Sequence, residues 1–488
     1  MADNQDLKKN TISGFFWRIS QNFGSQFINF GIQVVLARLL LPETYGIIAL
    51  TAIFSAIAGV IIQGTFSAAV IQRKNISQLE LSSVFFLGIL ISVLFYILIF
   101  VSSPAIASYY DEPLLKAVLR IQSLNLLIGS LYSTHQALLM RNMEYKKGFA
   151  SGVLGTLVQG VVGITLAFTG YGVWALVYSS IANNLITFLT IIILVKWRPT
   201  WEFSLKSVKI LFSYSSKIFL IGIMNAIYTN LLSLFIGKIY DSKTLGYYNK
   251  GYSFPSLIMV NVDGAMNTVL FSSLSSIQDN PEGIVKVLRR SMKMSLFISA
   301  PAMLGLVAVA EPLIALLLTD KWLPSVPFLR LVALGCLVWP LSARMQAINA
   351  VGRSDIALKL NIVLRTIGIA LLIFFARFDI YILVLSTFFG EIFIAIVLSF
   401  IIDKLIGYKI KDQMKDIFPS ILIASVMAVL VYSITFLGWN NIYTLAAQLA
   451  TGFISYIALA WIFKMDSLHY LINTIKSYLP KLKNRSDL

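Results

Sequence analysis

The sequence predicts an all-α polytopic membrane protein with about fourteen transmembrane helices, on three observations. The chain has 488 residues, of which 58 % are hydrophobic and 12 % are charged, whereas soluble domains are about 45–50 % apolar and about 25 % charged. The mean hydropathy is high, at +0.81, and apolar stretches of about 20 residues recur along the chain. Irregular backbone cannot face lipid, so these stretches are expected to be helices. A soluble enzyme is excluded.

The apolar segments fall into two sets of six and a final pair. The first six are separated by short polar loops and cover residues 11–41, 45–63, 81–101, 114–140, 149–168 and 171–195. After a polar break, six more cover residues 210–236, 247–270, 292–309, 328–350, 357–375 and 380–401. The last pair covers residues 417–437 and 442–463. The predicted domains are an N-lobe (1–195), a cytoplasmic inter-lobe linker (196–209), a C-lobe (210–402), and a C-terminal helix pair with a basic tail (403–488).

Lysine and arginine residues gather in every second loop. The chain carries 39 Lys and Arg against 22 Asp and Glu, a formal net charge of +17. When the loops are assigned alternately to two sides of a membrane, one side holds most of these bases, including Arg141, Lys196, Arg289 and the C-terminal tail. The positive-inside rule places that side and both termini in the cytoplasm. Short basic clusters between apolar segments differ from the continuous basic face of a nucleic-acid-binding protein, so no nucleic acid partner is expected.

The sequence lacks the residues that several kinds of active site require. Cys336 is the single cysteine and His135 and His469 are the two histidines, so neither an internal disulfide nor a Cys/His zinc site is expected. The phosphate-binding pattern G-x-x-x-x-G-K-[ST] is missing, and no predicted outer loop exceeds about twenty residues. We therefore expect no metal, no cofactor and no nucleotide hydrolysis. Energy would come from an ion gradient, the membrane potential or the substrate gradient.

An internal repeat relates the two predicted lobes. Residues 36–46 (LARLLLPETYG) align at an offset of 200 with residues 236–246 (IGKIYDSKTLG), and the match keeps a base, a threonine and a glycine. Ser25 and Asn29 meet Asn225 and Thr229 at the same offset. Lobes with an even number of spans are parallel repeats about an axis along the membrane normal, which in transporters places the substrate site between the halves. Chance similarity between apolar segments is the alternative.

Polar side chains follow one face of several predicted helices. In the first helix, Arg18, Asn22, Ser25 and Asn29 lie at i, i+4, i+7 and i+11, which forms a single stripe. An arginine at membrane depth costs about 2.5–3.5 kcal/mol on insertion scales, so it indicates a water-filled cavity or an anionic partner. The residues expected to line a substrate-binding cavity are Arg18, Asn22, Ser25, Asn29, Lys217, Asn225, Thr229, Lys250 and Arg344.

Each of these assignments has a simpler alternative. Neutral polar stripes commonly join helices through hydrogen bonds, and Arg18, Lys217 and Lys250 could extend to the membrane interface. Two carboxylates, Asp263 and Glu391, are candidates for coupling transport to a cation. For Glu391 the alternative is an ion pair with a base on a neighbouring helix.

Five motifs in order resemble those of bacterial polysaccharide exporters of the colanic-acid and teichuronic-acid type, within the multidrug/oligosaccharidyl-lipid/polysaccharide (MOP) flippase superfamily. The likeness covers nearly the full chain and is specific as a set, although each motif alone is weak. Ser272 departs from the pattern, because relatives often carry proline there. The motifs are residues 36–46, 245–250 (LGYYNK), 270–279 (LFSSLSSIQD), 322–330 (WLPSVPFLR) and 349–355 (NAVGRSD).

The resemblance implies a flippase of the bacterial inner membrane that serves exopolysaccharide or lipopolysaccharide biosynthesis. Its substrate would be an undecaprenyl-pyrophosphate-linked oligosaccharide repeat unit, translocated by alternating access of two lobes around a central cavity. Fixed cations would offset the desolvation of the pyrophosphate, and the last helix pair would offer a groove for the polyprenyl tail. Expected partners are the lipid-linked substrate, membrane lipids and the glycan polymerase machinery. The alternatives are a multidrug exporter of the same superfamily and, in a different class, a membrane glycan polymerase or ligase.

Overall fold

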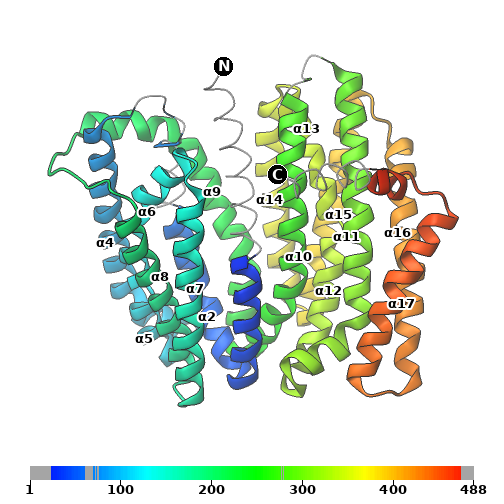
Figure 1. The fold of residues 1–488 in the computed structure, drawn as a ribbon, viewed down its shortest axis with the longest axis horizontal. Coiled ribbons are helices and arrows are strands. Elements are labelled where there is room, and N and C mark those ends of the chain that lie inside the picture. Colours follow the sequence, from blue (N-terminus) through cyan, green and yellow to red (C-terminus); the bar gives the residue numbers. More distant parts are fainter. Residues whose placement is uncertain are drawn as a thin grey trace, which may run out of the picture. The chain divides into compact units, whose positions relative to one another are not determined.

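The computed structural model describes residues 24–60, 70–71, 73, 76–275, 277 and 280–473. Inside these ranges the side chains at 58, 210–218, 265, 267–269, 271–273, 275, 281 and 354 are not described. The described residues form α-helices and short 3₁₀ helices joined by loops, with no strand among them. Contacts divide the chain into two compact units, Met1–Asn249 and Lys250–Leu488, and each is a set of long helices (Figure 1).

The first unit contains the helices up to and including the start of α10. α7 packs along α8, α4 packs on α5 and α6, and α2 contacts α9. Its described helices are residues 24–39, α2 (Pro42–Gly59), α4 (Gln78–Tyr109), α5 (Pro113–Gln122), α6 (Leu124–Arg141), α7 (Tyr145–Phe168), α8 (Val173–Leu194), α9 (Leu205–Ile239) and the start of α10 (Ser242–Ser275).

Local sequence explains where these helices begin. α2 and α5 start with Pro42 and Pro113 in the first turn, where a missing N–H costs nothing. α4 starts with a capping box, because the Ser77 hydroxyl accepts from the Glu80 N–H and the Glu80 carboxylate accepts from the Ser77 N–H at 2.8 Å. Arg73 then pairs with Glu80 at 2.8 Å. These caps fix the polar ends of apolar helices.

The second unit is built around α11. This helix packs against α12, α16 and α17, and α14 packs against α15. Two apolar clusters of buried side chains stabilise the unit, one around Leu288 and Ile402 and one around Met427 and Tyr456. The helices are α11 (Pro281–Leu318), η2 (Asp320–Ser325), α12 (Val326–Cys336), η3 (Trp339–Ser342), α13 (Ala343–Ala350), α14 (Ser354–Phe375), α15 (Ile380–Ile406), α16 (Ile410–Ser433), η4 (Ile434–Leu437) and α17 (Asn441–Ile462), besides the remainder of α10.

The predicted fold class is confirmed. All fourteen predicted segments have a helical counterpart in the part of the chain that is described. Eleven helical stretches there are long and apolar enough to cross a membrane, and the apolar part of α2 is shorter. The predicted lobes follow the repeat, whereas the contacts group α9 and the start of α10 with the first unit. The lobe boundaries stay a prediction.

Two predicted helices are interrupted, which corrects the expectation of continuous segments. The segment 114–140 divides at Ser123, between α5 and α6, and the Ser123 hydroxyl donates to the Arg120 carbonyl at 3.0 Å. The segment 328–350 divides into α12 and α13 with the 3₁₀ turn η3 between them. Pro340 lies in that turn, and its ring removes a donor that a continuous helix needs. α11 also begins at Pro281, eleven residues before the predicted start at 292.

Candidate functional site

Two stretches that align in the sequence repeat also meet in space. α2 begins at Pro42, and α10 begins at Ser242, its counterpart at the offset of 200. A Cβ atom on Gly46 would overlap the backbone carbonyl of Ser242, and a Cβ atom on Gly246 would overlap the backbone carbonyl of Pro42. Because Gly246 is the counterpart of Gly46, the contact is reciprocal. Glycine allows helix backbones to approach this closely, since any side chain would separate them.

An ion pair joins a further pair of counterparts. The Lys243 ammonium lies 3.6 Å from a Glu43 carboxylate oxygen, and both side chains are exposed. An exposed pair of this kind contributes about 0–1 kcal/mol. Close backbone packing and a weak ion pair therefore hold the two helix starts together. We call this set the repeat contact; it consists of Pro42, Glu43, Gly46, Ser242, Lys243 and Gly246.

Neighbouring side chains hold the start of α10 in place. The Asp241 carboxylate accepts from the Thr244 N–H at 2.6 Å and so caps the helix. The Ser242 hydroxyl donates to Glu112 at 2.8 Å. Both Asp241 and Ser242 therefore belong to a polar layer that continues into the turn between α4 and α5.

Several predicted cavity residues of the first unit fall where side chains are not described. Arg18 and Asn22 lie outside the described residues, and Lys217 lies on α9 with its side chain among those not described. Ser25 has a buried hydroxyl with no hydrogen-bond partner among the described residues, whereas Asn29 is exposed. The role of these residues stays a prediction.

The predicted polar residues of α9 are at least partly accessible. Asn225 is half-buried and Thr229 is exposed. The Thr229 hydroxyl donates to the Asn225 backbone carbonyl at 2.8 Å, so its donor is satisfied within its own helix. Both side chains retain acceptor capacity that a sugar hydroxyl could use.

The two predicted bases of the second unit are buried in different surroundings. Lys250 is 7 % exposed, and its ammonium lies 5.7 Å from the centre of the Trp322 ring. Arg344 is fully buried and donates from Nη1 to the Ala395 carbonyl at 2.8 Å. Its Nε and Nη2 atoms have no hydrogen-bond partner in the described part of the chain. Such donors would be stabilised by an anionic acceptor.

The two predicted coupling carboxylates are half-buried. Asp263 lies on α10, and Glu391 lies on α15. Arg365 on the neighbouring helix α14 attracts the Glu391 carboxylate electrostatically. The roles of Asp263 and Glu391, cation coupling or an ion pair for Glu391, stay predictions. No group of three or more His, Cys, Asp or Glu residues suited to a metal ion occurs among the described residues.

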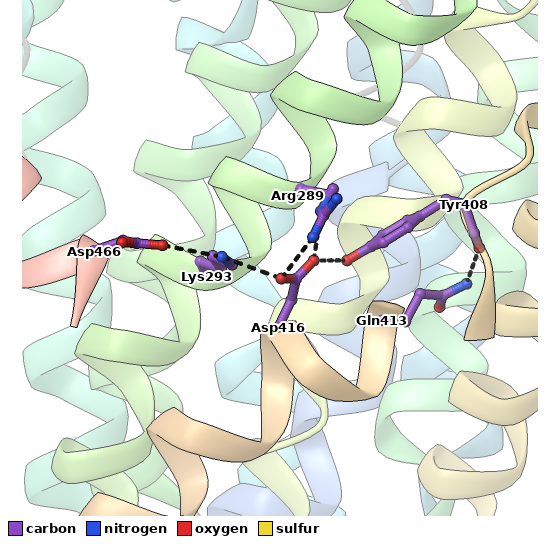
Figure 2. Close-up of polar contacts among 6 residues, drawn as sticks. All are labelled: Arg289, Lys293, Tyr408, Gln413, Asp416 and Asp466. Atoms are coloured by element: carbon purple, nitrogen blue, oxygen red, sulfur yellow. Dashed lines mark hydrogen bonds and ion pairs between the residues drawn. The ribbon is translucent and has the colours of Figure 1, made fainter. Parts of the chain in front are cut away.

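A polar cluster that the sequence did not indicate lies where α11, α16 and the α15–α16 loop meet (Figure 2). The Asp416 carboxylate accepts from Arg289 Nε at 2.7 Å and Nη2 at 3.1 Å. It also pairs with Lys293 at 3.1 Å and accepts from the Tyr408 hydroxyl at 2.6 Å. Lys293 in turn reaches Asp466 at 3.4 Å. Asp416 is 3 % exposed, and two bases and a hydroxyl compensate its buried charge.

The loop between α15 and α16 is fixed by the same cluster. The Gln413 amide donates to the Tyr408 carbonyl at 2.7 Å and to the Ser399 carbonyl at 3.1 Å. Burial and the neighbouring Asp416 carboxylate raise the pKa of the Tyr408 hydroxyl above its usual value. Tyr408 therefore remains a hydrogen-bond donor at neutral pH.

The residues of this cluster carry a weak sequence signal. Arg289 and Lys293 share one helix face at i and i+4. However, Arg289 precedes the predicted apolar segment 292–309, and Lys293 lies at its start. Asp416 lies 127 residues further along the chain from Arg289 and just before the predicted helix at 417. A single sequence contains no information that joins them.

The family of the chain follows from a match to a family model described as polysaccharide biosynthesis protein, which covers residues 35–327. The chain belongs to this polysaccharide biosynthesis protein family. The matched region contains the repeat contact, with both of its glycines. The resemblance inferred from the five motifs is thereby confirmed.

Two curated relatives illustrate the family. Over 305 residues, the chain is 26 % identical to the teichuronic acid biosynthesis protein TuaB of Bacillus subtilis, covering 62 % of this chain and 63 % of that relative. Over 366 residues, it is 25 % identical to the lipopolysaccharide biosynthesis protein WzxC of Escherichia coli, covering 73 % of each. The chain thus spans a little under two thirds of TuaB.

A solved structure supports the fold of this family member. The lipid II flippase MurJ, in an inward closed conformation, superposes with a TM-score of 0.74 over 93 % of this chain and 99 % of MurJ. The sequence identity is 18 %, so the likeness concerns the fold. The described helices therefore share the fold of MurJ.

Proposed function

We propose that this chain is a flippase that moves lipid-linked saccharide units across the bacterial inner membrane by alternating access, without nucleotide hydrolysis. The observation that carries the proposal is the repeat contact. Two helix starts related by the internal repeat meet reciprocally, with Gly46 against Ser242 and Gly246 against Pro42. Such a pseudo-symmetric junction is the kind of element that closes one side of a transporter built from parallel repeats.

The repeat contact has the energetics of a gate. Its ion pair between Glu43 and Lys243 is exposed, and such pairs contribute about 0–1 kcal/mol each. Close backbone packing at Gly46 and Gly246 adds weak contacts that depend on fit. The start of α10 has its own cap from Asp241, and α2 begins with Pro42, which needs no N–H donor there.

The sidedness of this gate follows from charge. The loops that carry Lys238 and Lys243 belong to the side with few bases, whereas most bases lie on the other side. The positive-inside rule assigns the basic side and both termini to the cytoplasm. On this assignment the repeat contact would lie on the outer side of the membrane and act as the outer gate.

A substrate with a pyrophosphate group accounts for the buried bases. Lys250 is nearly fully buried and Arg344 is fully buried with two unsatisfied donors among the described residues. A buried base such as Arg344, whose Nε and Nη2 donors have no partner in the described part of the chain, is expensive in a membrane and marks a functional position. A pyrophosphate would supply the missing acceptors. η3, next to α13, provides a break at which Arg344 can become accessible.

The same proposal covers the predicted lobes and partners. The lobes 1–195 and 210–402 would rock against each other, with the predicted cavity residues between them. The names of TuaB and WzxC point to polysaccharide assembly, so the glycan polymerase that consumes the flipped unit is the proposed partner. Asp263 and Glu391 are the proposed cation-coupling residues, because both are half-buried carboxylates on helices.

Accumulation of substrate on the inner face tests the proposal. Cells that depend on this chain are given the double variant Arg18→Ala/Lys217→Ala, and lipid-linked oligosaccharide is measured on the cytoplasmic side. We expect accumulation there at normal protein levels, with unchanged susceptibility to cationic drugs. Normal export would contradict the proposal. Increased drug susceptibility without accumulation would instead identify a multidrug exporter.

A further inference from the structure

Two hollows lie side by side at one end of the second unit, where α11 begins and α17 ends. The first has a volume of about 460 Å³ and is bounded by the first turns of α11 and by the segment after α17. The second, of about 490 Å³, lies between α16 and the end of α17. Lys293, Asp466 and Ser467 line both hollows. Within the described residues, none of the predicted cavity residues lines either of them.

Bases outnumber acids around these hollows. The bases are Lys286, Arg289, Arg290, Lys293, Lys415 and Lys464, and the acids are Glu282, Asp416 and Asp466. Asp416 already pairs with Arg289 and Lys293. Lys415 and Lys464, which face the second hollow, form no ion pair with a described carboxylate. The second hollow is lined by three bases and by Asp416 and Asp466, both paired with Lys293, so Lys415 and Lys464 are its cations without an ion-pair partner among the described carboxylates.

An apolar stripe continues from these bases along the membrane-spanning part of α16. Lys415, Pro419, Leu422 and Val426 lie at i, i+4, i+7 and i+11, on one face of the helix, and all of them line the second hollow. Leu459 and Phe463 line it from α17. Leu422, Val426 and Phe463 are exposed. The hollow is thus cationic near the helix ends and apolar toward the bilayer interior.

We propose that an anionic glycerophospholipid binds in the second hollow. Its phosphate would lie between Lys293, Lys415 and Lys464, and one acyl chain would follow the stripe of Leu422 and Val426. Basic residues at helix ends on the cytoplasmic side attract anionic headgroups, and a basic pocket between transmembrane helices gives them a defined seat. Asp416 positions Lys293 for this contact through their 3.1 Å ion pair.

The depth of Lys415 and Lys464 along their helices matches the depth of a lipid headgroup in the bilayer. Lys415 lies in the second turn of α16, which begins at Ile410, and Lys464 follows the end of α17 at Ile462. Both therefore lie near the interface, whereas Leu422 and Val426 lie about two and three turns deeper. A free phosphate would be held by the same bases but would make no use of the apolar stripe. Charge and depth together favour the phospholipid.

Melting temperatures of the purified full-length protein in detergent test this proposal. Phosphatidylglycerol is the anionic probe and phosphatidylcholine the neutral one, and native mass spectrometry counts the bound lipids. The test variant is Lys415→Gln/Lys464→Gln. The matched control is Lys404→Gln/Lys411→Gln, which removes two exposed bases of the same end that line neither hollow. We expect phosphatidylglycerol to raise the melting temperature of the wild type and the control, and the test variant to lose at least half of this shift.

Other outcomes overturn the proposal. An equal loss in the test variant and the control would mean diffuse surface attraction. An equal shift with inorganic phosphate would mean that the apolar stripe is not used, and displacement of phosphatidylglycerol by equimolar polyprenyl phosphate would assign the hollow to the transported lipid. If the test variant folds poorly, Lys415→Arg/Lys464→Arg retains the charge and must retain the shift. None of these readouts requires transport, so the proposed flippase function is tested separately.

Discussion

Gly46 and Gly246 each lie against the backbone carbonyl that begins the other's helix. They are counterparts at the offset of 200 in the predicted repeat, so two aligned stretches of the sequence build one junction. Glu43 and Lys243 are also counterparts at the offset of 200, and their side chains form an ion pair. A contact of this kind links the sequence repeat directly to the proposed closure of one side of the membrane.

Added bulk at the repeat contact should impair transport. In Gly46→Ala, the new methyl group would overlap the Ser242 carbonyl, and overpacking of this type costs about 1–3 kcal/mol. A bias of that size shifts a two-state equilibrium about 5- to 150-fold, here away from the closed outer side. Flipping in proteoliposomes measures the effect. Gly390→Ala is the control because its Cβ meets nothing within 4 Å, and equal activity of both variants would contradict the proposed gate.

Loss of the Asp416 carboxylate should destabilise the second unit. Asp416→Asn removes the negative charge and one of the two acceptor oxygens that Arg289, Lys293 and Tyr408 share. Removing one partner of a buried pair costs about 3–5 kcal/mol, and partial exposure of the two bases reduces this to about 2–3 kcal/mol. The melting temperature in detergent should fall by several degrees. Asp466→Asn, at an 86 % exposed position, should change it little, and similar melting temperatures for the two variants would be inconsistent with the cluster.

The contribution of Tyr408 should not depend on pH between about 6 and 9. Its pKa is raised by burial and by Asp416, so the hydroxyl is protonated in the folded and the unfolded state throughout this range. The stability it adds is complete below the unfolded pKa of about 10 and is lost only above the still higher folded value. Tyr408→Phe should therefore lower the melting temperature equally at both ends of the range. A difference that disappears by pH 9 would mean that the hydroxyl ionises early.

If Lys250 serves to bind substrate, its charge should not be needed for folding. Lys250→Met replaces a charge at 7 % exposure with an apolar side chain of similar length. Replacing buried charge in this way is often neutral or stabilising, so the melting temperature should hold or rise while export falls at least tenfold. Lys404→Met, at an exposed position, should leave export unchanged. Lower stability of Lys250→Met with normal export would make Lys250 a structural residue.

The sequence predicted those parts of the fold that depend on hydropathy. The positions of the helices follow from the lengths of the apolar stretches, because a helix that crosses the bilayer needs about 20 apolar residues. The predicted repeat identified the counterparts that meet at Gly46 and Gly246. Breaks such as the one at Ser123 were missed because serine is tolerated inside helices and its effect there depends on local hydrogen bonding. Pro340 is a stronger signal, although proline also occurs within continuous membrane helices such as α11.

The candidate site was less predictable than the fold. The polar stripe on α9 was visible as a periodicity, but periodicity does not tell whether Thr229 faces a cavity or its own backbone, and its hydroxyl bonds to the backbone of Asn225. Asp416 acts through partners 123 and 127 residues away, Lys293 and Arg289. Such long-range ion pairs form only after helices pack, and no local pattern in the chain encodes them.

Reversible locking of the repeat contact tests the central claim most directly. Glu43→Cys/Lys243→Cys is made in a Cys336→Ser background, cross-linked with a short cleavable thiol reagent, and assayed for flipping of an undecaprenyl-pyrophosphate-linked saccharide in proteoliposomes. Glu144→Cys/Lys147→Cys, which replaces an ion pair of 2.7 Å at the start of one helix, is the control. We expect flipping to stop when the first pair is linked, to return when the link is cleaved, and to continue in the linked control. Unchanged flipping through the linked repeat contact would contradict the account.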